Sequence, residues 1–313
     1  MTTTDYLADM RACAEAINLG VTEFVLPEDR WVDLNGLRFH YLDWGNETKP
    51  PLVLLHGGSL TAHTWDMAAL MLRQHYHLIA LDQRGHGDTG WTPEAQFGED
   101  NDEVMLRDTE AFIDHLGYDR IILCGMSMGG INAFRYASRH ADRLRALIIV
   151  DVAPVLMQEG QVDMAKFRQE TETLSRFDDF LERAVKFAPQ RKPAHLKYSL
   201  LHALKQVPEG WTWKQDRRQR PGAPTGDAAL AVRAERNARL WDDVRAIPTP
   251  TLLMRGGISR ILSMESADAT AKEMADCETV EIPNAGHTVQ GDNPADFARE
   301  LDAFVAKRLG PGR

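Results

Sequence analysis

Six short apolar segments alternate with helical patterns along the chain from residue 51 onward. They are PLVLLHGG, HLIALDQRG, RIILCGMS, ALIIVDVAP, PTLLMRGG and ETVEIPNAGH. Segments that are apolar on both faces and separated by helices are typical of a parallel sheet that is covered on both sides. The pattern of hydrophobic and polar positions therefore predicts an α/β fold.

The N-terminal part of the chain adds a helix and a hairpin. Residues 5–19 carry apolar side chains at steps of three and four, at Leu7, Met10, Ala14 and Ile17. This spacing predicts an amphipathic helix, and Gly20 ends it. The stretch RWVDLNGLRFHYLDWG then predicts two strands around Asn35-Gly36, a dipeptide typical of tight hairpin turns. With this hairpin, the predicted sheet has eight strands and is mostly parallel.

The alternation of strands and helices is interrupted once, between about Val155 and Arg245. Helical patterns and the Pro- and Gly-rich loop RRQRPGAPTGD occur there, without a buried strand. An insertion of this size between two strands predicts a helical cap over the carboxyl edge of the sheet, where ligands bind in such folds. The expected domains are a core of residues 1–154 and 246–313 and a cap of residues 155–245, inserted after the sixth strand.

Composition and charge narrow the classes of partner. The 313 residues carry a formal net charge of −10, whereas a nucleic-acid-binding protein needs a basic face. The longest apolar runs, such as LVLL and ALIIV, are far too short to cross a bilayer, and no signal-peptide pattern occurs. The three cysteines have no metal-like spacing. We expect a cytoplasmic protein that acts on a small molecule and binds neither nucleic acid nor a membrane.

Ser127 lies where an apolar strand ends and a helix begins, in the sequence Gly-Met-Ser-Met-Gly. Gly125 and Gly129 allow a tight, strained turn that exposes the serine hydroxyl and directs the positive end of the helix toward it. A serine at this place can also be an ordinary helix N-cap. The combination of strand, turn and helix favours a nucleophile instead.

A serine hydroxyl becomes reactive only when a base removes its proton. His287 follows the last predicted strand, in IPNAGHTVQGDNP, and therefore lies at the same edge of the sheet as Ser127. His56 and His86 also lie at this edge, but each belongs to a Gly-rich turn whose shape it is expected to support. We interpret His287 as the general base.

The segments HGGS, DQRGHGDT, GMSMGG and PNAGH occur in an order and spacing that resemble the α/β-hydrolase family, from about Trp31 to Leu309. In that family the catalytic acid commonly follows the seventh strand, where this chain has Ser259. Asp151 ends the sixth predicted strand and resembles the acid of an esterase-like branch of the family. Asp82 is the rival, but the resemblance implies that it braces the Gly-rich turn. We expect Asp151 to orient His287.

Two backbone N–H groups are expected to stabilise the oxyanion that forms during attack, those of Met128 and Gly58. Met128 follows the nucleophile, and Gly58 lies in the turn after LLHGG. The expected substrate-binding residues are Ser59, Trp65, Met126, Trp211 and Trp213. For the two cap tryptophans, packing of the cap onto the core is an equally good interpretation, and Trp65 can instead pack beneath the pocket.

Serine, histidine and aspartate together predict acyl transfer through an acyl-enzyme, without a cofactor or a metal. The expected substrate is a carboxylic ester, a lactone or a thioester. Related folds hydrolyse carbon–carbon bonds of dienoate-type diketones with the same triad, or act as cofactor-free oxygenases. A small-molecule receptor that keeps the triad without turnover is the alternative from a different class.

Overall fold

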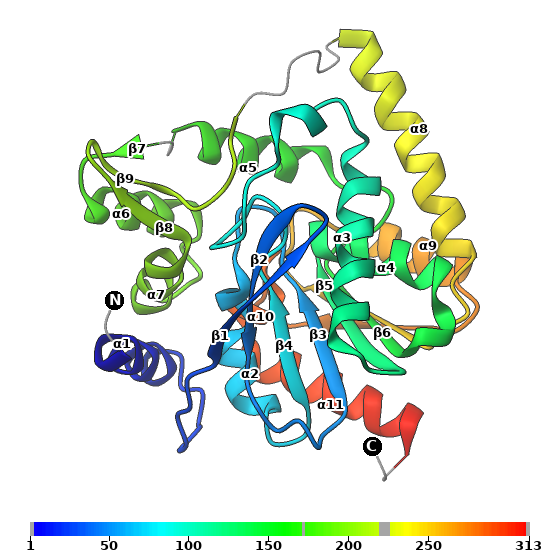
Figure 1. Ribbon diagram of the computed structural model, residues 1–313, viewed down its shortest axis with the longest axis horizontal. Helices are drawn as coiled ribbons and strands as arrows, with labels where there is room; N and C mark the ends of the chain where they lie inside the picture. Colours follow the sequence, from blue (N-terminus) through cyan, green and yellow to red (C-terminus); the bar gives the residue numbers. More distant parts are fainter. Residues whose placement is uncertain (1–2, 171–172, 219–225, 311–313) are drawn as a thin grey trace.

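The computed structural model describes residues 3–170, 173–218 and 226–310. One sheet of eight strands lies at its centre, in the order β1-β2-β4-β3-β5-β6-β10-β11 (Figure 1). The strands are β1 Glu28–Leu34, β2 Leu37–Asp43, β3 Pro51–Leu55, β4 His77–Leu81, β5 Ile121–Met126, β6 Leu144–Val150, β10 Thr251–Gly256 and β11 Cys277–Ile282. Neighbouring strands from β4 to β11 along this order are parallel, whereas β2 is antiparallel to β1 and β4. The predicted α/β fold with a mostly parallel, eight-stranded sheet is confirmed.

The hairpin and the N-terminal helix follow the local signals closely. Asn35 and Gly36 connect β1 to β2 with φ angles of +49° and +76°, the two left-handed conformations that a type I′ turn requires. Helix α1 spans Thr3–Ala16 and ends earlier than predicted. The reason is that Asn18 also has a positive φ, of +53°, so the backbone has already left the helix there.

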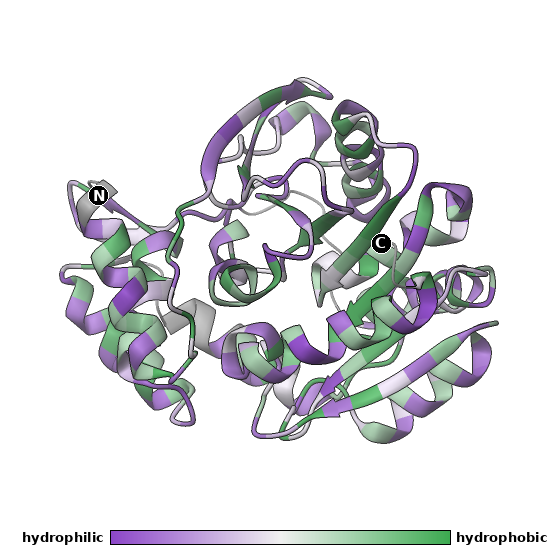
Figure 2. Cartoon of the chain, turned by 90° about the horizontal axis from the view of Figure 1, so that it is seen from below, coloured by the Kyte–Doolittle hydropathy of each residue, from purple (hydrophilic) through white to green (hydrophobic). Residues whose placement is uncertain are grey.

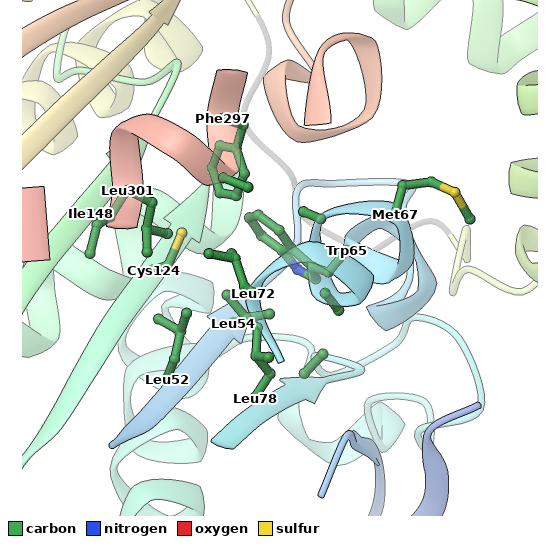
Figure 3. Packing of buried hydrophobic residues seen from close by; sticks show 14 of the residues in the cluster. Leu52, Leu54, Trp65, Met67, Leu72, Leu78, Cys124, Ile148, Phe297 and Leu301 are labelled. Atoms are coloured by element: carbon green, nitrogen blue, oxygen red, sulfur yellow. The ribbon is translucent and has the colours of Figure 1, made fainter. Parts of the chain in front are cut away.

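Helices cover both faces of the sheet. In β3, Leu52 and Leu54 belong to one buried cluster, and Val53 and Leu55 belong to another on the opposite face. Helices α2 Asp66–Leu72 and α11 Pro294–Leu309 close the first cluster, which Figure 3 shows in part. Helices α3 Asn101–Leu116, α4 Met128–Arg139, α8 Gly226–Arg245 and α9 Met264–Glu273 contribute to the second. Burial on both faces explains why inner strands such as β3 are apolar throughout, whereas the edge strands β1 and β11 alternate apolar and polar residues.

The segment between β6 and β10 forms the cap. It contains α5 Gln158–Glu170, α6 Phe177–Phe187 and α7 Pro193–Ala203, and also a small antiparallel sheet of β7 Thr173–Leu174, β9 Gly210–Trp213 and β8 Leu204–Val207. The predicted helical cap thus also contains a small sheet that the sequence did not indicate. The three strands have two to four residues each, which is too short for a recognisable alternation.

Helix α8 connects the cap to the core. Its residues Leu240 and Val244 are buried in the cluster on the α4 side of the sheet. The C-terminal part of α8 thus packs with the core, although the predicted cap extends to Arg245. At the other end of the cap, α1 lies against α7 (Figure 1).

Hydropathy follows this layered arrangement. The central strands are mostly hydrophobic, whereas the outer helices alternate hydrophobic and hydrophilic positions (Figure 2). Three short 3-10 helices, η1 Ala62–Trp65, η2 Glu94–Gln96 and η3 Ala141–Arg143, and the short helix α10 Val289–Asp292 complete the elements. Among the described residues, no helix has the length and apolar character needed to span a membrane.

Candidate active site

Ser127 occupies a strained turn between β5 and α4. Its φ of +51° and ψ of −115° lie outside the regions that a side-chain-bearing residue usually adopts. The turn is held by hydrogen bonds from Ser127 N–H to the Val150 carbonyl (3.0 Å) and from Ile131 N–H to the Ser127 carbonyl (3.0 Å). The Ser127 hydroxyl makes no capping bond to the helix, so the N-cap interpretation fails.

Glycine is required on both sides of this turn because other backbone segments pack directly against it. A Cβ atom on Gly125 would lie 2.2 Å from the carbonyl oxygen of Gly129. A Cβ atom on Gly129 would lie 2.2 Å from the carbonyl oxygen of Leu55. The close approach of β3, β5 and α4 therefore explains the glycines that the sequence places around the serine.

The structure brings Ser127, His287 and Asp151 together from three separate segments. His287 lies in the loop between β11 and α10, and its Nε2 is 3.0 Å from Ser127 Oγ. Its Nδ1 is 2.8 Å from Asp151 Oδ2. The carboxylate can only accept, so Nδ1 carries the proton and Nε2 accepts from the serine hydroxyl. This is the arrangement in which imidazole can act as a base toward Ser127.

Asp151 is fully buried and follows β6 with a φ of +51°. Its Oδ1 accepts a hydrogen bond from Gly256 N–H (2.9 Å), and its Oδ2 accepts one from Ser259 Oγ (2.5 Å) in addition to His287. Ser259 stands where the family commonly has its acid. Ser259 therefore donates a hydrogen bond to the carboxylate that is the predicted acid on the neighbouring strand.

The two predicted oxyanion donors line one side of the site. Met128 is the first residue of α4, and Gly58 is in the turn after β3. Neither N–H has an acceptor within the part of the chain that the structure describes. The two turns are joined because Gly129 N–H donates to the His56 carbonyl (3.1 Å). A Cβ atom on Gly58 would meet nothing within 4 Å, so the space beside its Cα is open.

His56 and His86 support turns, as predicted. His56 Nε2 accepts from Gln83 N–H (3.0 Å), and its Nδ1 bonds the Gly57 carbonyl (2.8 Å). Burial lowers the pKa of His56, which keeps the ring neutral. His86 Nδ1 bonds the Arg84 carbonyl (3.0 Å), and burial lowers the pKa of His86 to about 4.

Asp82, the rival acid, is fully engaged elsewhere. It accepts from the N–H groups of Ala62 (2.7 Å) and Asp88 (3.0 Å) and bonds His40 Nδ1 (2.7 Å). Burial opposes protonation of His40, but hydrogen bonds to Asp29 and Asp82 outweigh it and raise the pKa of His40 to about 9. Asp82 therefore joins β2, β4 and two turns and does not contact His287.

A cavity of about 590 Å³ opens above Ser127 and His287. Its apolar lining comes from both the core and the cap and includes Leu60, Met126, Met164, Phe187, Leu196, Leu200, Trp213, Ile258 and Ile261. Gly58 and three of the predicted substrate-binding residues, Ser59, Met126 and Trp213, line the cavity.

Trp65 and Trp211 are not among the residues that line this cavity. Trp65 is fully buried in the core, where its ring packs 5.8 Å from the ring of Phe297. Trp211 packs edge-on against Phe177 in the cap, with ring centroids 5.4 Å apart. Their prediction as pocket residues was wrong because each ring packs against another aromatic ring within its own part of the molecule.

Arg191 and Asp292 line the cavity and were missed from the sequence. Asp292 Oδ2 accepts a hydrogen bond from Gly286 N–H (2.7 Å), directly before His287, and its Oδ1 accepts one from Arg191 Nε. Arg191 belongs to the cap, between α6 and α7. An ion pair thus links the cap to the loop that carries His287, and no local pattern connects these two remote residues.

Two groups of histidine and aspartate are close enough to bind a metal within the described residues. In the group of His40, Asp82 and Asp88, both ring nitrogens of His40 already bond carboxylates, of Asp82 (2.7 Å) and Asp29 (3.0 Å). The other group consists of His63, Asp66 and His202. His63 lines the cavity, so this second group adjoins the candidate active site.

Comparison with known proteins agrees with this geometry. A profile described as "Alpha/beta hydrolase family" matches residues 52–300. Esterase Rv0045c of Mycobacterium tuberculosis is 29% identical over 264 residues, which cover 81% of this chain and 81% of that protein. The sn-1-specific diacylglycerol lipase ABHD11 of Mus musculus is 26% identical over 283 residues, which cover 86% and 85%. A crystal structure of esterase Rv0045c superimposes with a TM-score of 0.74 at 25% identity, covering 97% of this chain and 98% of that one.

Proposed function

The chain belongs to the alpha/beta hydrolase family, and we propose that it is a serine esterase that cleaves carboxylic esters with an apolar acyl group. One observation carries the proposal. Ser127 Oγ, the His287 ring and the Asp151 carboxylate form a continuous chain of hydrogen bonds of 3.0 and 2.8 Å at the base of an apolar cavity. The likeness to two curated relatives that are an esterase and a lipase supports the same reaction class.

The proposed reaction has two halves. Ser127 Oγ attacks the ester carbonyl while His287 Nε2 takes its proton, and the Met128 and Gly58 N–H groups bind the oxyanion. The protonated ring then gives its proton to the leaving alcohol as the carbon–oxygen bond breaks, which leaves an acyl-enzyme. Water, deprotonated by His287, attacks this acyl-enzyme and releases the acid and free Ser127. Asp151 holds the ring in place in both halves.

The lining of the cavity supports an apolar acyl group. A volume of about 590 Å³ is suited to a small organic molecule. Two cations of the lining are already paired, Arg191 with Asp292 and Arg260 with Asp163 at 2.6 Å. Lys186, a third cation of the lining, has no ion pair among the described residues, so carbon–carbon bond hydrolysis of a dienoate-type diketone, which carries a carboxylate, stays the alternative reaction.

We further propose that the protein works in a reducing compartment, where its three cysteines stay as thiols. Cys13, Cys124 and Cys277 are all free thiols. Burial raises the pKa of Cys13 and of Cys277 to about 12, so neither is a reactive thiolate at neutral pH.

The test is turnover of p-nitrophenyl acetate and p-nitrophenyl butyrate by the wild-type chain and by Ser127→Ala. We expect steady release of p-nitrophenol with the wild type, faster with butyrate, and loss of this activity in Ser127→Ala. A single-turnover burst followed by no further release would support a receptor instead. Turnover that persists in a folded Ser127→Ala variant would refute the proposed nucleophile.

A further inference from the structure

A second cluster of titratable side chains lies beside the cavity. His63 is in η1, Asp66 begins α2, and His202 lies near the end of α7 in the cap. One nitrogen of each ring and one carboxylate oxygen all lie within 4.8 Å of one another. The rings of His63 and His202 stack with centroids 3.8 Å apart. The cluster therefore joins the cap to the core at the wall of the cavity.

Two polar atoms of this cluster are buried without a hydrogen-bond partner among the described residues, Asp66 Oδ1 and His202 Nε2. Asp66 is fully buried, and His202 is 7% exposed. Leaving a buried polar atom without a hydrogen-bond partner is unfavourable. A bound cation can accept the lone pairs of a carboxylate oxygen and of an imidazole nitrogen and so satisfy both atoms.

The rest of the cluster already holds these ligands in position. The other oxygen of Asp66 accepts hydrogen bonds from Tyr6 OH (3.0 Å) and Tyr198 OH, and it bonds His63 Nδ1 (3.0 Å). Outer groups of this kind orient metal ligands in known sites. Burial also keeps the pKa of His202 well below that of free imidazole, so the ring is neutral and its lone pair is available.

The donor set selects the class of ion. Two imidazoles and one carboxylate suit borderline divalent transition metals, such as Zn²⁺, Co²⁺ and Ni²⁺, better than Mg²⁺ or Ca²⁺. Metal–ligand distances of about 2.0–2.2 Å place ligands on opposite sides of an ion about 4 Å apart. The present separations reach 4.8 Å and the two rings are stacked, so binding one ion requires the three side chains to draw together and the rings to turn.

We propose that His63, Asp66 and His202 form a binding site for a divalent transition metal, and that occupancy of this site inhibits the hydrolase. His63 lines the cavity together with Gly58 and Ser127. An ion that joins His63 to His202 fixes α7 of the cap against η1 and places a positive charge at the wall of an apolar cavity. The binding part stands independently, whereas the inhibition part rests on the proposed esterase function.

The experiment titrates Co²⁺ and Zn²⁺ into chelator-treated full-length protein. It compares the wild type with His202→Leu, which removes a ligand outside the cavity lining, and with His140→Leu as a matched control. His140 pairs with Glu110 on another part of the surface, at 2.8 Å. Calorimetry gives stoichiometry and affinity, the Co²⁺ absorption spectrum reports the ligands, and thermal unfolding reports stabilisation of the folded state.

We expect one ion per chain, a raised Tm in the wild type and in His140→Leu, and binding at least tenfold weaker in His202→Leu. Ester turnover should fall with the same midpoint as binding, and His202→Leu should resist this inhibition. His202→Gln replaces His202→Leu if the latter does not fold.

Several results would overturn the proposal. Equal binding by wild type and His202→Leu, or no binding at all, rejects the site. Binding that disappears in His287→Ala shows that the ion sits on the catalytic histidine instead. Binding without inhibition rejects the regulatory part alone. If the protein turns over no ester, calorimetry still decides the metal site, so the two failures are distinguishable.

Discussion

Replacing Asp151 by asparagine tests the geometry of the site most directly. In the wild type, Gly256 N–H donates to Oδ1, while Ser259 and His287 face Oδ2. The backbone donor fixes the orientation of an amide at this position, because only the amide oxygen can accept from Gly256. The NH₂ group of the introduced asparagine must then face His287 Nδ1. It donates to that nitrogen and forces the ring proton onto Nε2.

This tautomer removes the base, because Nε2 can no longer accept the Ser127 proton. The equivalent change in serine proteases with the same arrangement lowers kcat about 10,000-fold. We expect a similar loss, on the order of 5 kcal/mol in the barrier for acylation. The side-chain volume hardly changes, and two of the three hydrogen bonds at this position can still form. The fold should therefore persist.

The assay is single-turnover acylation by p-nitrophenyl butyrate, with thermal unfolding and circular dichroism as checks on the fold. The double variant Asp151→Asn, Ser259→Asp returns a carboxylate to the neighbouring strand end and should recover part of the rate. A folded Asp151→Asn variant that keeps kcat within tenfold of wild type would refute the assignment of the acid. Asp82→Asn should mainly lower stability. A larger rate loss in Asp82→Asn than in Asp151→Asn would therefore also refute Asp151 as the acid.

Three further predictions concern the surroundings of the triad. Gly58→Ala should keep near-normal kcat because its Cβ meets open space, whereas Gly58→Pro should lose about 100-fold or more because it removes the N–H; equal rates in steady-state assays would exclude Gly58 as a donor. His40 has its pKa raised from 6.5 to about 9, so its contribution to stability is complete below pH 6.5 and is lost as pH rises through 9. Tm should fall across this window in the wild type but not in His40→Gln, and parallel pH profiles would contradict the pairing with Asp82. Gly129→Ala should lower the free energy of unfolding in urea by about 2 kcal/mol or more, because its Cβ would lie 2.2 Å from the Leu55 carbonyl oxygen; an unchanged midpoint would show that the turn is looser than described.

The sequence predicted the parts of the site that depend on local signals. Ser127 lies between glycines at the end of a predicted strand, and His287 follows the last predicted strand. The neighbouring residues therefore indicate where each of these side chains lies in the fold. Asp151 could be proposed because parallel strands end at a common edge. The hydrogen bond from Ser259 to Asp151 could not be predicted, because it depends on how far two loops from different strands bend toward each other.

The cap was less predictable than the core. Its strands are too short for a recognisable alternation of apolar and polar residues. The sequence also does not indicate which residues its two tryptophans contact. The cluster of His63, Asp66 and His202 shows the same limit, since His202 is far from the other two in the sequence and meets them only when α7 docks on η1. Side chains contributed by separately folded layers leave no periodic signal in one sequence.

The ion pair between Arg191 and Asp292 bears on how such proteins exchange parts during evolution or engineering. A foreign cap grafted at the strand ends would leave the Asp292 carboxylate, with 2% of its side chain exposed, without its cation. Removing one partner of a buried pair costs about 3–5 kcal/mol, and here the strain would fall on the loop that carries the imidazole. In a chimera, residues 190–192 and 286–292 should therefore come from the same parent protein.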